Sequence, residues 1–358
     1  MANFSINLRK ESKISEVDFD NIPFGRVFAD HMFIIDYEEG EWKNGRIEPY
    51  GDLCLSPALS CMHYGQAIFE GMKAYKSPSN EILLFRPLDN HKRLNRSAER
   101  MCMPSVPEDI FMSGLELLLN IDSAWIPQKE GSSLYIRPFM IGTDDYLGVK
   151  PSSKYSFIIY FCPVGSYYNQ HLRIQIEEKY VRAAAGGVGY AKAAGNYAAS
   201  MYPASLVQKH GYQQLLWTDA IEHKYIEELG TSNFFALIGD TLITPELEGT
   251  ILDGITRDSV IKLAKHLGHA VEEKRFEVAE LIEAAKNGTL KEAFATGTAA
   301  TLAKIETIAF RGTDHNLDVE SSVLAEDLAN RLDAIKNGHS EDPFGWVHKV
   351  ESQSVHSY

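Results

Sequence analysis

The sequence predicts an α+β protein of two domains, and its length, composition and element pattern support this prediction. The chain has 358 residues, which exceeds the usual size of one hydrophobic core, and 44% of them are hydrophobic. Strand-like runs and helical patterns are mixed along its whole length. Residues 163–170 are rich in Gly, Tyr and Asn, a composition typical of a linker. We therefore expect a smaller domain at 1–165, a linker at 166–175 and a larger domain at 176–358.

The N-terminal domain is expected to combine strands with one clear helix. Residues 81–85 and 154–162 are strand-like runs of apolar and aromatic residues. Residues 89–101 form a helical pattern, because apolar side chains recur at i, i+4 and i+7 from Leu94. These elements leave the functional class open, since fold alone does not determine function.

The C-terminal domain is expected to open with short strands and to continue with helices. The expected strands are 172–176, 213–217, 234–238 and 241–244. One helix should open near Thr256, with the apolar residues between Val260 and Leu267 on one face. Another should span 278–286 and stop at Gly288, where glycine allows a left-handed turn.

Charge and hydropathy exclude several classes of partner. The formal net charge of −14 repels nucleic acid and anionic lipid, and no basic run offsets it. Residues 1–13 lack the apolar region of a signal peptide, and the apolar run at 157–164 is too short to span a bilayer. We therefore expect a cytoplasmic protein that binds neither nucleic acid nor membrane.

Cysteines and histidines give no sign of a metal or redox centre. The four cysteines are Cys54, Cys61, Cys102 and Cys162. They show no C-x-x-C spacing, so burial as structural residues is expected. His266 and His269 come closest to ligand spacing, yet no carboxylate is placed to join them, and we expect a solvated pair at a helix end. No bound metal is expected.

Lys192 lies in a segment of unusually small residues, Gly-Gly-Val-Gly-Tyr-Ala-Lys-Ala-Ala-Gly-Asn-Tyr at 186–197. Glycine costs backbone entropy and leaves nothing to pack, so we expect something bulky to lie against this backbone. A lysine that loses its proton through desolvation can attack a carbonyl group and form a Schiff base. A flexible glycine-rich loop with an exposed lysine explains the segment equally well, so this segment alone leaves both interpretations open.

This segment resembles the lysine motif of branched-chain amino acid aminotransferases, which are pyridoxal-phosphate enzymes of class IV (fold type IV). Four further segments match the same family in order: Phe-Glu-Gly-Met-Lys-Ala-Tyr at 69–75, Tyr-Ile-Arg-Pro at 135–138, Glu-Leu-Gly-Thr-Ser-Asn at 228–233 and Gly-Thr-Ala at 297–299. The similarity runs from about residue 24 to about residue 346. It implies a smaller N-terminal α/β domain and a larger C-terminal domain that carries the Schiff-base lysine, with the cofactor at their interface.

The resemblance implies a set of residues that bind pyridoxal 5'-phosphate. Lys192 would bind the aldehyde, and Glu228 would hold the pyridine nitrogen protonated so that the ring accepts electrons. Arg93 would bind the phosphate, together with the start of the helix that opens after Gly254. The full expected set is Lys192, Arg93, Tyr197, Glu228, Thr231, Ile255, Thr256 and Thr298.

Neighbouring residues of the same types are expected to be solvated. Lys73 and Lys304 lack small neighbours on both sides, so we expect packed stems with solvated amines. Arg96 and Arg100 are expected to be solvated, and Glu227 is expected to be a surface acid.

The resemblance also implies a substrate pocket and a dimer. Without it, the aromatic residues of this set would be assigned to the core. Arg137 is different, because an arginine between Ile136 and Pro138 in a strand-like run requires an anionic partner. Val149 resembles a residue that family dimers contribute to the neighbouring subunit's pocket, so a homodimer is expected. The expected substrate-binding set is Phe28, Tyr64, Phe69, Tyr135, Arg137, Val149, Tyr167, Thr298 and Ala299.

The activity that the resemblance implies is transfer of the amino group of leucine, isoleucine or valine to 2-oxoglutarate, giving branched 2-oxo acids and L-glutamate. Lys192 would act as the general base in both half-reactions, and the kinetics would be ping-pong. A D-amino acid aminotransferase or an aminodeoxychorismate lyase would use the same lysine and carboxylate. The segments at 69–75 and 135–138 favour the branched-chain enzyme. A cofactor-holding or purely structural relative is the alternative outside the enzyme class.

Overall fold

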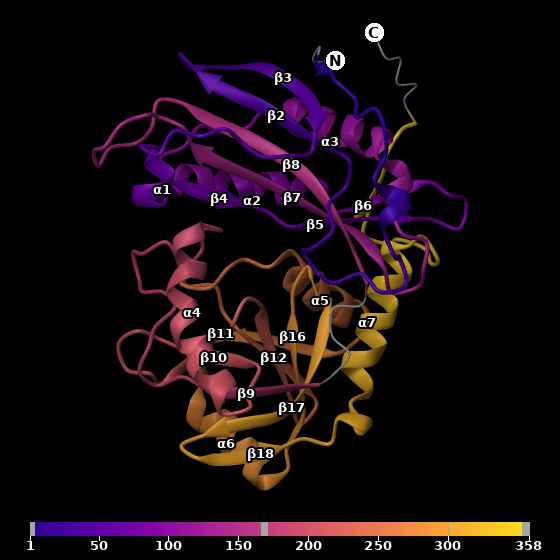
Figure 1. The fold of residues 1–358 in the computed structure, drawn as a ribbon. Coiled ribbons are helices and arrows are strands. Elements are labelled where there is room, and N and C mark those ends of the chain that lie inside the picture. Colours follow the sequence, from indigo (N-terminus) through magenta and orange to yellow (C-terminus); the bar gives the residue numbers. More distant parts are fainter. Residues whose placement is uncertain (1–3, 166–170, 300, 353–358) are drawn as a thin grey trace. The chain divides into compact units, whose positions relative to one another are not determined.

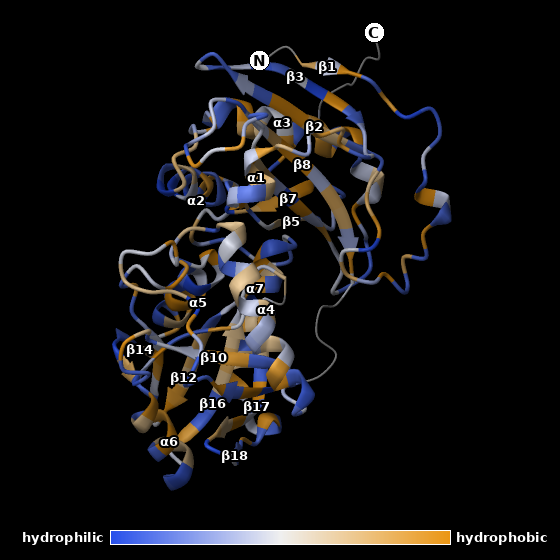
Figure 2. Cartoon of the chain, turned by 60° about the vertical axis from the view of Figure 1, so that its left-hand side comes forward, coloured by the Kyte–Doolittle hydropathy of each residue, from blue (hydrophilic) through white to orange (hydrophobic). Residues whose placement is uncertain are grey.

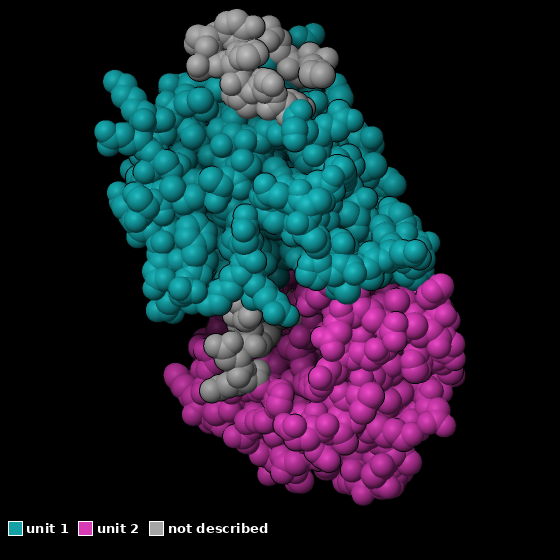
Figure 3. Space-filling view, turned by 90° about the vertical axis from the view of Figure 1, so that its right-hand side faces the viewer, with its two compact units in different colours: residues 1–167, 191–194, 334–358 teal, residues 168–190, 195–333 magenta. Residues whose placement is uncertain are grey.

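The structure is a computed structural model that describes residues 4–165, 171–299 and 301–352. The chain forms two compact units, which Figure 3 shows in different colours. Unit 1 comprises residues 1–167, 191–194 and 334–358, and unit 2 comprises residues 168–190 and 195–333. In the described part of the chain, no helix has both the length and the hydropathy of a transmembrane span.

The two units differ from the predicted domains after residue 165. Strand β9 (Leu172–Ile176) occupies the last four residues of the segment 166–175 that we expected to be a linker. Lys192 belongs to unit 1, because Ala193 forms a β-bridge with Ile68. The C-terminal strand β19 (Val347–Lys349) pairs with a strand of unit 1 as well. Hydrogen bonding between distant segments therefore places residues from the second half of the chain in unit 1. As a result unit 1 is longer than unit 2, whereas we expected the C-terminal domain to be the larger.

Unit 1 is built on one sheet with the strand order β1-β3-β2-β8-β7-β5-β6-β19, and β4 also pairs with β7 (Figure 1). The strands are β1 (Ser5–Ile6), β2 (His31–Glu38), β3 (Glu41–Pro49), β4 (Ala67–Phe69), β5 (Met72–Lys76), β6 (Ile82–Phe85), β7 (Ser133–Gly142), β8 (Tyr155–Val164) and β19. Glu39 and Gly40 connect β2 to β3 with φ values of 56° and 86°. Two such residues make the tight turn whose twist matches an antiparallel hairpin.

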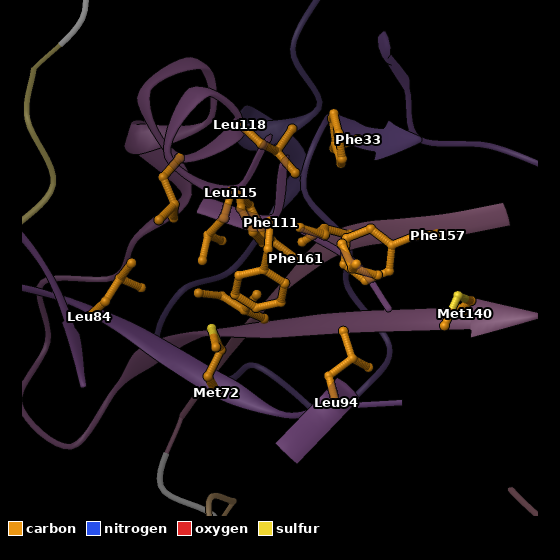
Figure 4. Packing of buried hydrophobic residues seen from close by; sticks show 14 of the residues in the cluster. Phe33, Met72, Leu84, Leu94, Phe111, Leu115, Leu118, Met140, Phe157 and Phe161 are labelled. Atoms are coloured by element: carbon orange, nitrogen blue, oxygen red, sulfur yellow. The ribbon is translucent and has the colours of Figure 1, made fainter. Parts of the chain in front are cut away.

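The helices of unit 1 cover the apolar core. They are α1 (Ser60–Tyr64), α2 (Pro87–Arg100), α3 (Glu108–Ile121) and the 3-10 turns η1 (Ile14–Glu16) and η2 (Ser123–Trp125). Pro87 suits the first position of α2, because the amide hydrogen that proline lacks has no partner there. Figure 4 shows Phe111 of α3 close to Phe157 of β8, and their ring centroids lie 6.0 Å apart. Both side chains are fully buried, so helix and sheet share one core.

Unit 2 contains a sheet with the strand order β14-β13-β12-β16-β17-β9-β10-β11-β15, and β18 also pairs with β17. These strands are β9, β10 (Gln214–Thr218), β11 (Tyr225–Leu229), β12 (Asn233–Ile238), β13 (Thr241–Pro245), β14 (Ala270–Lys274), β15 (Phe276–Glu277), β16 (Leu290–Thr296), β17 (Leu302–Phe310) and β18 (Thr313–Asn316). Phe235 and Phe294 face each other across β12 and β16, with stacked rings 5.2 Å apart. Figure 2 accordingly shows hydrophobic colour along β12, whereas α2 is mainly hydrophilic.

The remaining helices are α4 (Ala194–Lys209), which begins at the end of the lysine segment, α5 (Ile255–His266), α6 (Val278–Asn287), η3 (Val319–Ser321) and α7 (Val323–Lys336). Gly288 follows α6 with a φ of 76°, so the predicted glycine stop is confirmed. The predicted strand at 172–176 coincides with β9, and the predicted helix at 89–101 corresponds to α2. The linker assigned to 163–170 begins too early, since β8 continues through Val164.

We predict that Gly114→Ala destabilises the protein although alanine favours helix formation. A Cβ at this position of α3 would lie 2.6 Å from the fully buried ring of Phe33. Overpacking of this kind costs about 1 to 3 kcal/mol, against a gain of at most about 1 kcal/mol in helix propensity. The shift in the urea unfolding midpoint measures the difference. The same substitution in a Phe33→Leu background should cost less, and an equal cost in both backgrounds would contradict the steric explanation.

Candidate active site

The glycines around Lys192 leave room for protein atoms. A Cβ on Gly189 would lie 2.5 Å from the carbonyl oxygen of Thr250 and equally close to the Cβ of Ala183. Gly186 adopts a φ of 79°, which side chains other than glycine rarely allow. At Gly189, the bulky neighbour that we expected for this backbone is therefore another segment of unit 2.

The main chain of Lys192 is fixed by three contacts within unit 1. Its N–H donates to the Ser97 hydroxyl on α2 at 2.9 Å, and its carbonyl accepts from the Phe69 N–H at 3.1 Å. The β-bridge between Ile68 and Ala193 extends this pairing. The lysine is therefore held at its backbone and is only half-buried at its side chain.

Phe69 brings together two predicted residues of different roles. The Lys192 Nζ lies 4.8 Å from the centroid of the Phe69 ring, and the Arg137 Cζ lies 4.7 Å from the same centroid. Cations are attracted to the face of an aromatic ring. Arg137 also donates to the Tyr135 hydroxyl at 3.2 Å. Gly71 makes this arrangement possible, because a Cβ there would overlap the Tyr135 hydroxyl.

The other residues predicted for the substrate pocket are less closely associated with Phe69, Tyr135 and Arg137. Phe28 packs against the cluster that contains Tyr135 and stacks on Tyr50 at 4.7 Å. Tyr64 is 44% exposed at the end of α1, and Val149 is 89% exposed in the loop after β7. Tyr167 lies outside the described residues. Of the predicted aromatic pocket residues, Phe28, Phe69 and Tyr135 therefore form one aromatic group, which we call the aromatic wall.

Arg93 turns inward from α2, as predicted, but it binds a carboxylate. Its Nε and Nη2 donate to the two carboxylate oxygens of Glu70 at 2.8 and 2.9 Å. Glu70 is fully buried, and its Oε2 also accepts from the Gly71 N–H at 3.1 Å. The two bonds to Glu70 use two of the five N–H donors of the Arg93 guanidinium. Glu70 was missed in the sequence, although an acid between Phe69 and Gly71 in an apolar run needs a partner as much as Arg137 does.

Glu228 lies on β11 and is 2% exposed. It forms an ion pair with the equally buried Arg182, and its Oε2 accepts from the Leu252 N–H at 3.0 Å. Asn233 lies at hydrogen-bond distance from the same oxygen, at 3.5 Å. A carboxylate that receives several donors is stabilised in its charged form. Arg182, between Val181 and Ala183, was missed by the sequence analysis, although its apolar flanks carry the same signal as those of Arg137.

Glu227 is not the surface acid that we expected. It is 6% exposed, and the successive residues from Ile226 to Leu229 are all buried, so both faces of β11 are covered. Burial is the main cause that raises the pKa of Glu227 to about 7, and the negative charge of Glu228 acts in the same direction. A hydrogen bond from Thr250 opposes the shift.

The remaining predicted cofactor residues of unit 2 lie on elements that adjoin Glu228. Asn233 donates to the Leu252 carbonyl at 2.9 Å, two residues before Gly254 begins the first turn of α5 with Ile255 and Thr256. The N-cap residue Gly254 has no side chain to cap this helix, and a Cβ at this position would overlap Asn233. Amide groups at a helix start favour an anion.

The pairing of β12 with β16 places further predicted residues close to Asn233. Asn233 is paired with Thr296, whose buried hydroxyl has no partner among the residues described, and Thr298 and Ala299 follow directly. Thr231 is exposed in the turn after Glu228, and Tyr197 is half-buried in the first turns of α4. The described contacts do not connect Tyr197 to Glu228.

The alternatives that we set aside have ordinary surroundings. Lys304 forms an ion pair with Glu326 at 2.8 Å, and Arg96 is exposed. Within the described chain, no group of three His, Cys, Asp or Glu side chains could hold a metal ion. Cys54 and Cys102 are exposed, which corrects the expectation that each cysteine is buried.

The chain belongs to the class IV aminotransferase family, since the sequence model described as amino-transferase class IV matches residues 67–308. Branched-chain-amino-acid aminotransferase 2 of Bacillus subtilis (strain 168) is 44% identical over 346 residues, which cover 95% of each chain. A branched-chain aminotransferase from Thermoproteus uzoniensis, solved with norvaline, is 25% identical with a TM-score of 0.74 and covers 90% of this chain and 100% of its own. The branched-chain amino acid aminotransferase from Escherichia coli is 26% identical, with a TM-score of 0.72 and coverage of 90% and 99%. The expected family and the α+β fold of type IV are thus confirmed.

We predict that Arg182→Met destabilises the protein by about 3 to 5 kcal/mol, because it leaves the charge of Glu228 buried without its cation. Adding Glu228→Gln should recover a large part of the loss. Arg173→Met is the matched control, since Arg173 pairs with Asp314 at the surface of the same sheet. Exposed pairs contribute about 1 kcal/mol or less. Equal losses for the two single variants in urea unfolding would contradict the role assigned to Arg182.

Proposed function

We propose that the protein transfers amino groups from branched-chain L-amino acids to 2-oxoglutarate with pyridoxal 5'-phosphate as cofactor. The family match and the names of the similar proteins support the reaction class. The observation that carries the substrate assignment is the position of Lys192 and Arg137 over the one ring of Phe69. An amine and a fixed cation then lie beside one aromatic wall, which suits both an apolar side chain and a carboxylate.

The residues present fit the cofactor. Glu228 is buried and paired with Arg182, which suits a protonated pyridine nitrogen, and the start of α5 and the buried Thr296 hydroxyl suit an anion. The residues that would hold the cofactor are Lys192, Arg93, Tyr197, Glu228, Thr231, Ile255, Thr256 and Thr298. When bound, pyridoxal phosphate supplies an electron sink for the charge left by removal of the α-proton.

Each of these residues has a task that follows from its surroundings. Lys192 is only half-buried, so its amine can reach the cofactor and exchange protons with the substrate as general base. Glu228 would hold a proton at the pyridine nitrogen, because its pair with Arg182 favours its charged form. Arg93, which Glu70 orients through two hydrogen bonds, would bind the phosphate.

On the substrate side, Arg137 receives the γ-carboxylate of glutamate and 2-oxoglutarate, while the aromatic wall receives leucine, isoleucine or valine. The proposed set is Phe28, Tyr64, Phe69, Tyr135, Arg137, Val149, Tyr167, Thr298 and Ala299. Arginine binds carboxylates in two-point geometry, and a methyl-rich side chain gains from apolar contact.

A homodimer is part of this proposal. Met62, Leu147 and Val149 are 59%, 63% and 89% exposed. A β-bridge between Leu59 and Asp145 joins their segments into one surface. Exposed apolar clusters of this kind mark interaction surfaces. Light scattering should give a dimer mass, and Val149→Asp should lower it.

The direct test is a panel of L- and D-amino acids with 2-oxoglutarate as acceptor. Turnover confined to L-leucine, L-isoleucine, L-valine and L-glutamate supports the proposal. Turnover of D-alanine would indicate a D-amino acid aminotransferase. Release of pyruvate from aminodeoxychorismate would indicate the lyase. Cofactor binding without any turnover would indicate a relative that is not an enzyme.

We predict that Arg137→Ala separates the two half-reactions. The loss of a hydrogen bond to a charged group costs about 1.5 to 3 kcal/mol, or roughly 10- to 150-fold in rate. This loss should fall on glutamate, while leucine, which has no side-chain carboxylate, serves as the internal control. Single-turnover rates with each amino acid measure the effect. Equal losses on both substrates would mean that Arg137 acts on the α-carboxylate or on the structure.

A further inference from the structure

Glu227 is a buried carboxyl group of unit 2 that the proposed reaction leaves without a task. It lies beside Glu228 on β11, and successive residues of a strand point to opposite faces of the sheet. Its Oε2 is buried and has no hydrogen-bond partner in the described part of the chain. Burying an unpaired carboxylate is costly, so this position requires an explanation.

Thr250 connects Glu227 to the ion pair of Glu228. It lines the same small cavity as Glu227, whose pKa its side chain lowers, and its carbonyl oxygen accepts from the Arg182 Nη1 at 2.9 Å. Two residues further on, the Leu252 N–H donates to Glu228 at 3.0 Å. The two adjacent acids therefore hold the same short segment, 250–252, from two directions.

Glu228 receives more hydrogen-bond donors than Glu227 does. Glu228 receives the Arg182 Nε, the Leu252 N–H and the side chain of Asn233. Glu227 has one buried oxygen unsatisfied among the residues described. Donors favour the charged form of a carboxyl group, and burial without donors favours the neutral form. Glu228, which receives the guanidinium, thus keeps the charge, and Glu227 keeps the proton.

We propose that Glu227 is a positioning residue whose neutral carboxyl group holds Thr250, and through it Arg182 and Leu252, in place against Glu228. The neutral form adds no second negative charge beside the ion pair of Arg182 and Glu228. This inference rests on the proposed role of Glu228 at the pyridine nitrogen, and it adds a residue that acts on the cofactor only through others.

The charges around Glu227 agree with this assignment. Burial is the main cause that raises its pKa to about 7, and the charges of Glu228 and Asp219 add to it. Arg182 and the Thr250 hydrogen bond oppose the shift. The titratable and charged groups that face Glu227 are Glu228, Arg182 and Asp219, with Tyr225, Glu246, Glu248 and Arg275 around the adjacent cavity.

A bound cation is a poorer explanation of this acidic surrounding. The cavity beside Glu227 measures about 30 Å³, which is room for little more than a water molecule. Asp219 already accepts backbone N–H groups from Ile221, Glu222, Lys224 and Tyr225 on its two oxygens. Its oxygens are therefore committed to the turn, and a proton on Glu227 is the simpler way to reduce the charge.

The proposal fixes the direction of the pH dependence. The pKa of Glu227 is raised on folding, so its contribution to stability is complete below the pKa of the unfolded chain and is lost as pH rises through about 7. Above that pH, the ionised Glu227 places a second negative charge beside Glu228. A like charge nearby disfavours the charged form of a carboxyl group.

The first experiment uses the full chain freed of cofactor. Thermal unfolding of wild type, Glu227→Gln and Glu248→Gln is followed between about pH 5.5 and about pH 9, the range that brackets the raised pKa. Wild type should lose several degrees relative to Glu227→Gln as pH rises through the middle of this range. Glu248, which lines the same cavity, is the matched control and should follow wild type. A wild-type curve parallel to that of Glu227→Gln would show that Glu227 carries no proton.

The second experiment measures the dissociation constant of pyridoxal phosphate as a function of pH. Wild-type affinity should fall by about tenfold above the titration of Glu227, which corresponds to one pK unit of lost interaction. Glu227→Gln, neutral at every pH, should keep the low-pH affinity throughout. Glu227→Leu and Thr250→Val, which break the connection, should bind weakly at every pH.

These outcomes separate the inference from the proposed function. Tight, pH-independent binding by Glu227→Leu would overturn the positioning role while leaving Glu228 in place. Failure of wild type to bind the cofactor would end the proposed function, and the unfolding experiment would still decide whether Glu227 holds a proton.

Discussion

A charged carboxylate can be buried only where cations or N–H donors replace the water that it loses, and this constraint acts in both units. Glu70 meets Arg93 in unit 1, and Glu228 meets Arg182 in unit 2. Apolar residues of similar size would stabilise the fold at least as well as such pairs. The proposed function gives a reason for their presence, since Glu70 would orient an arginine for phosphate in unit 1 and Arg182 would keep an acid ionised for the pyridine nitrogen in unit 2.

Arg182 extends this organisation to the lysine segment. Besides Glu228, its guanidinium donates to the carbonyl oxygens of Gly189 at 3.2 Å and Thr250 at 2.9 Å. The same two segments approach so closely that Gly189 cannot carry a side chain. The small residues before Lys192 therefore serve close packing around the arginine that supports Glu228. The chain then leaves unit 2, and Ser97 and Phe69 of unit 1 hold the lysine itself.

Local sequence patterns were sufficient for most elements and for the motifs of the candidate site. Glycine at position 288 ends α6, and the apolar run at 172–176 forms β9, because both depend on neighbouring residues alone. Arg182 and Glu70 were missed because each acquires its importance from a partner that is distant in sequence. Glu227 was assigned to the surface because its burial depends on β10 and β15, which flank β11 in the sheet. The return of β19 to unit 1 likewise depends on long-range pairing with β6.

The most direct test of the whole account is the identity of the lysine that carries the cofactor. Borohydride reduction of the protein with pyridoxal phosphate, followed by peptide mapping, should place the pyridoxyl group on Lys192, the lysine whose backbone is fixed by Ser97 and Phe69. Lys73 and Lys304 should remain unlabelled, the latter because it is engaged with Glu326. Labelling of either of those lysines in place of Lys192 would contradict the central claim.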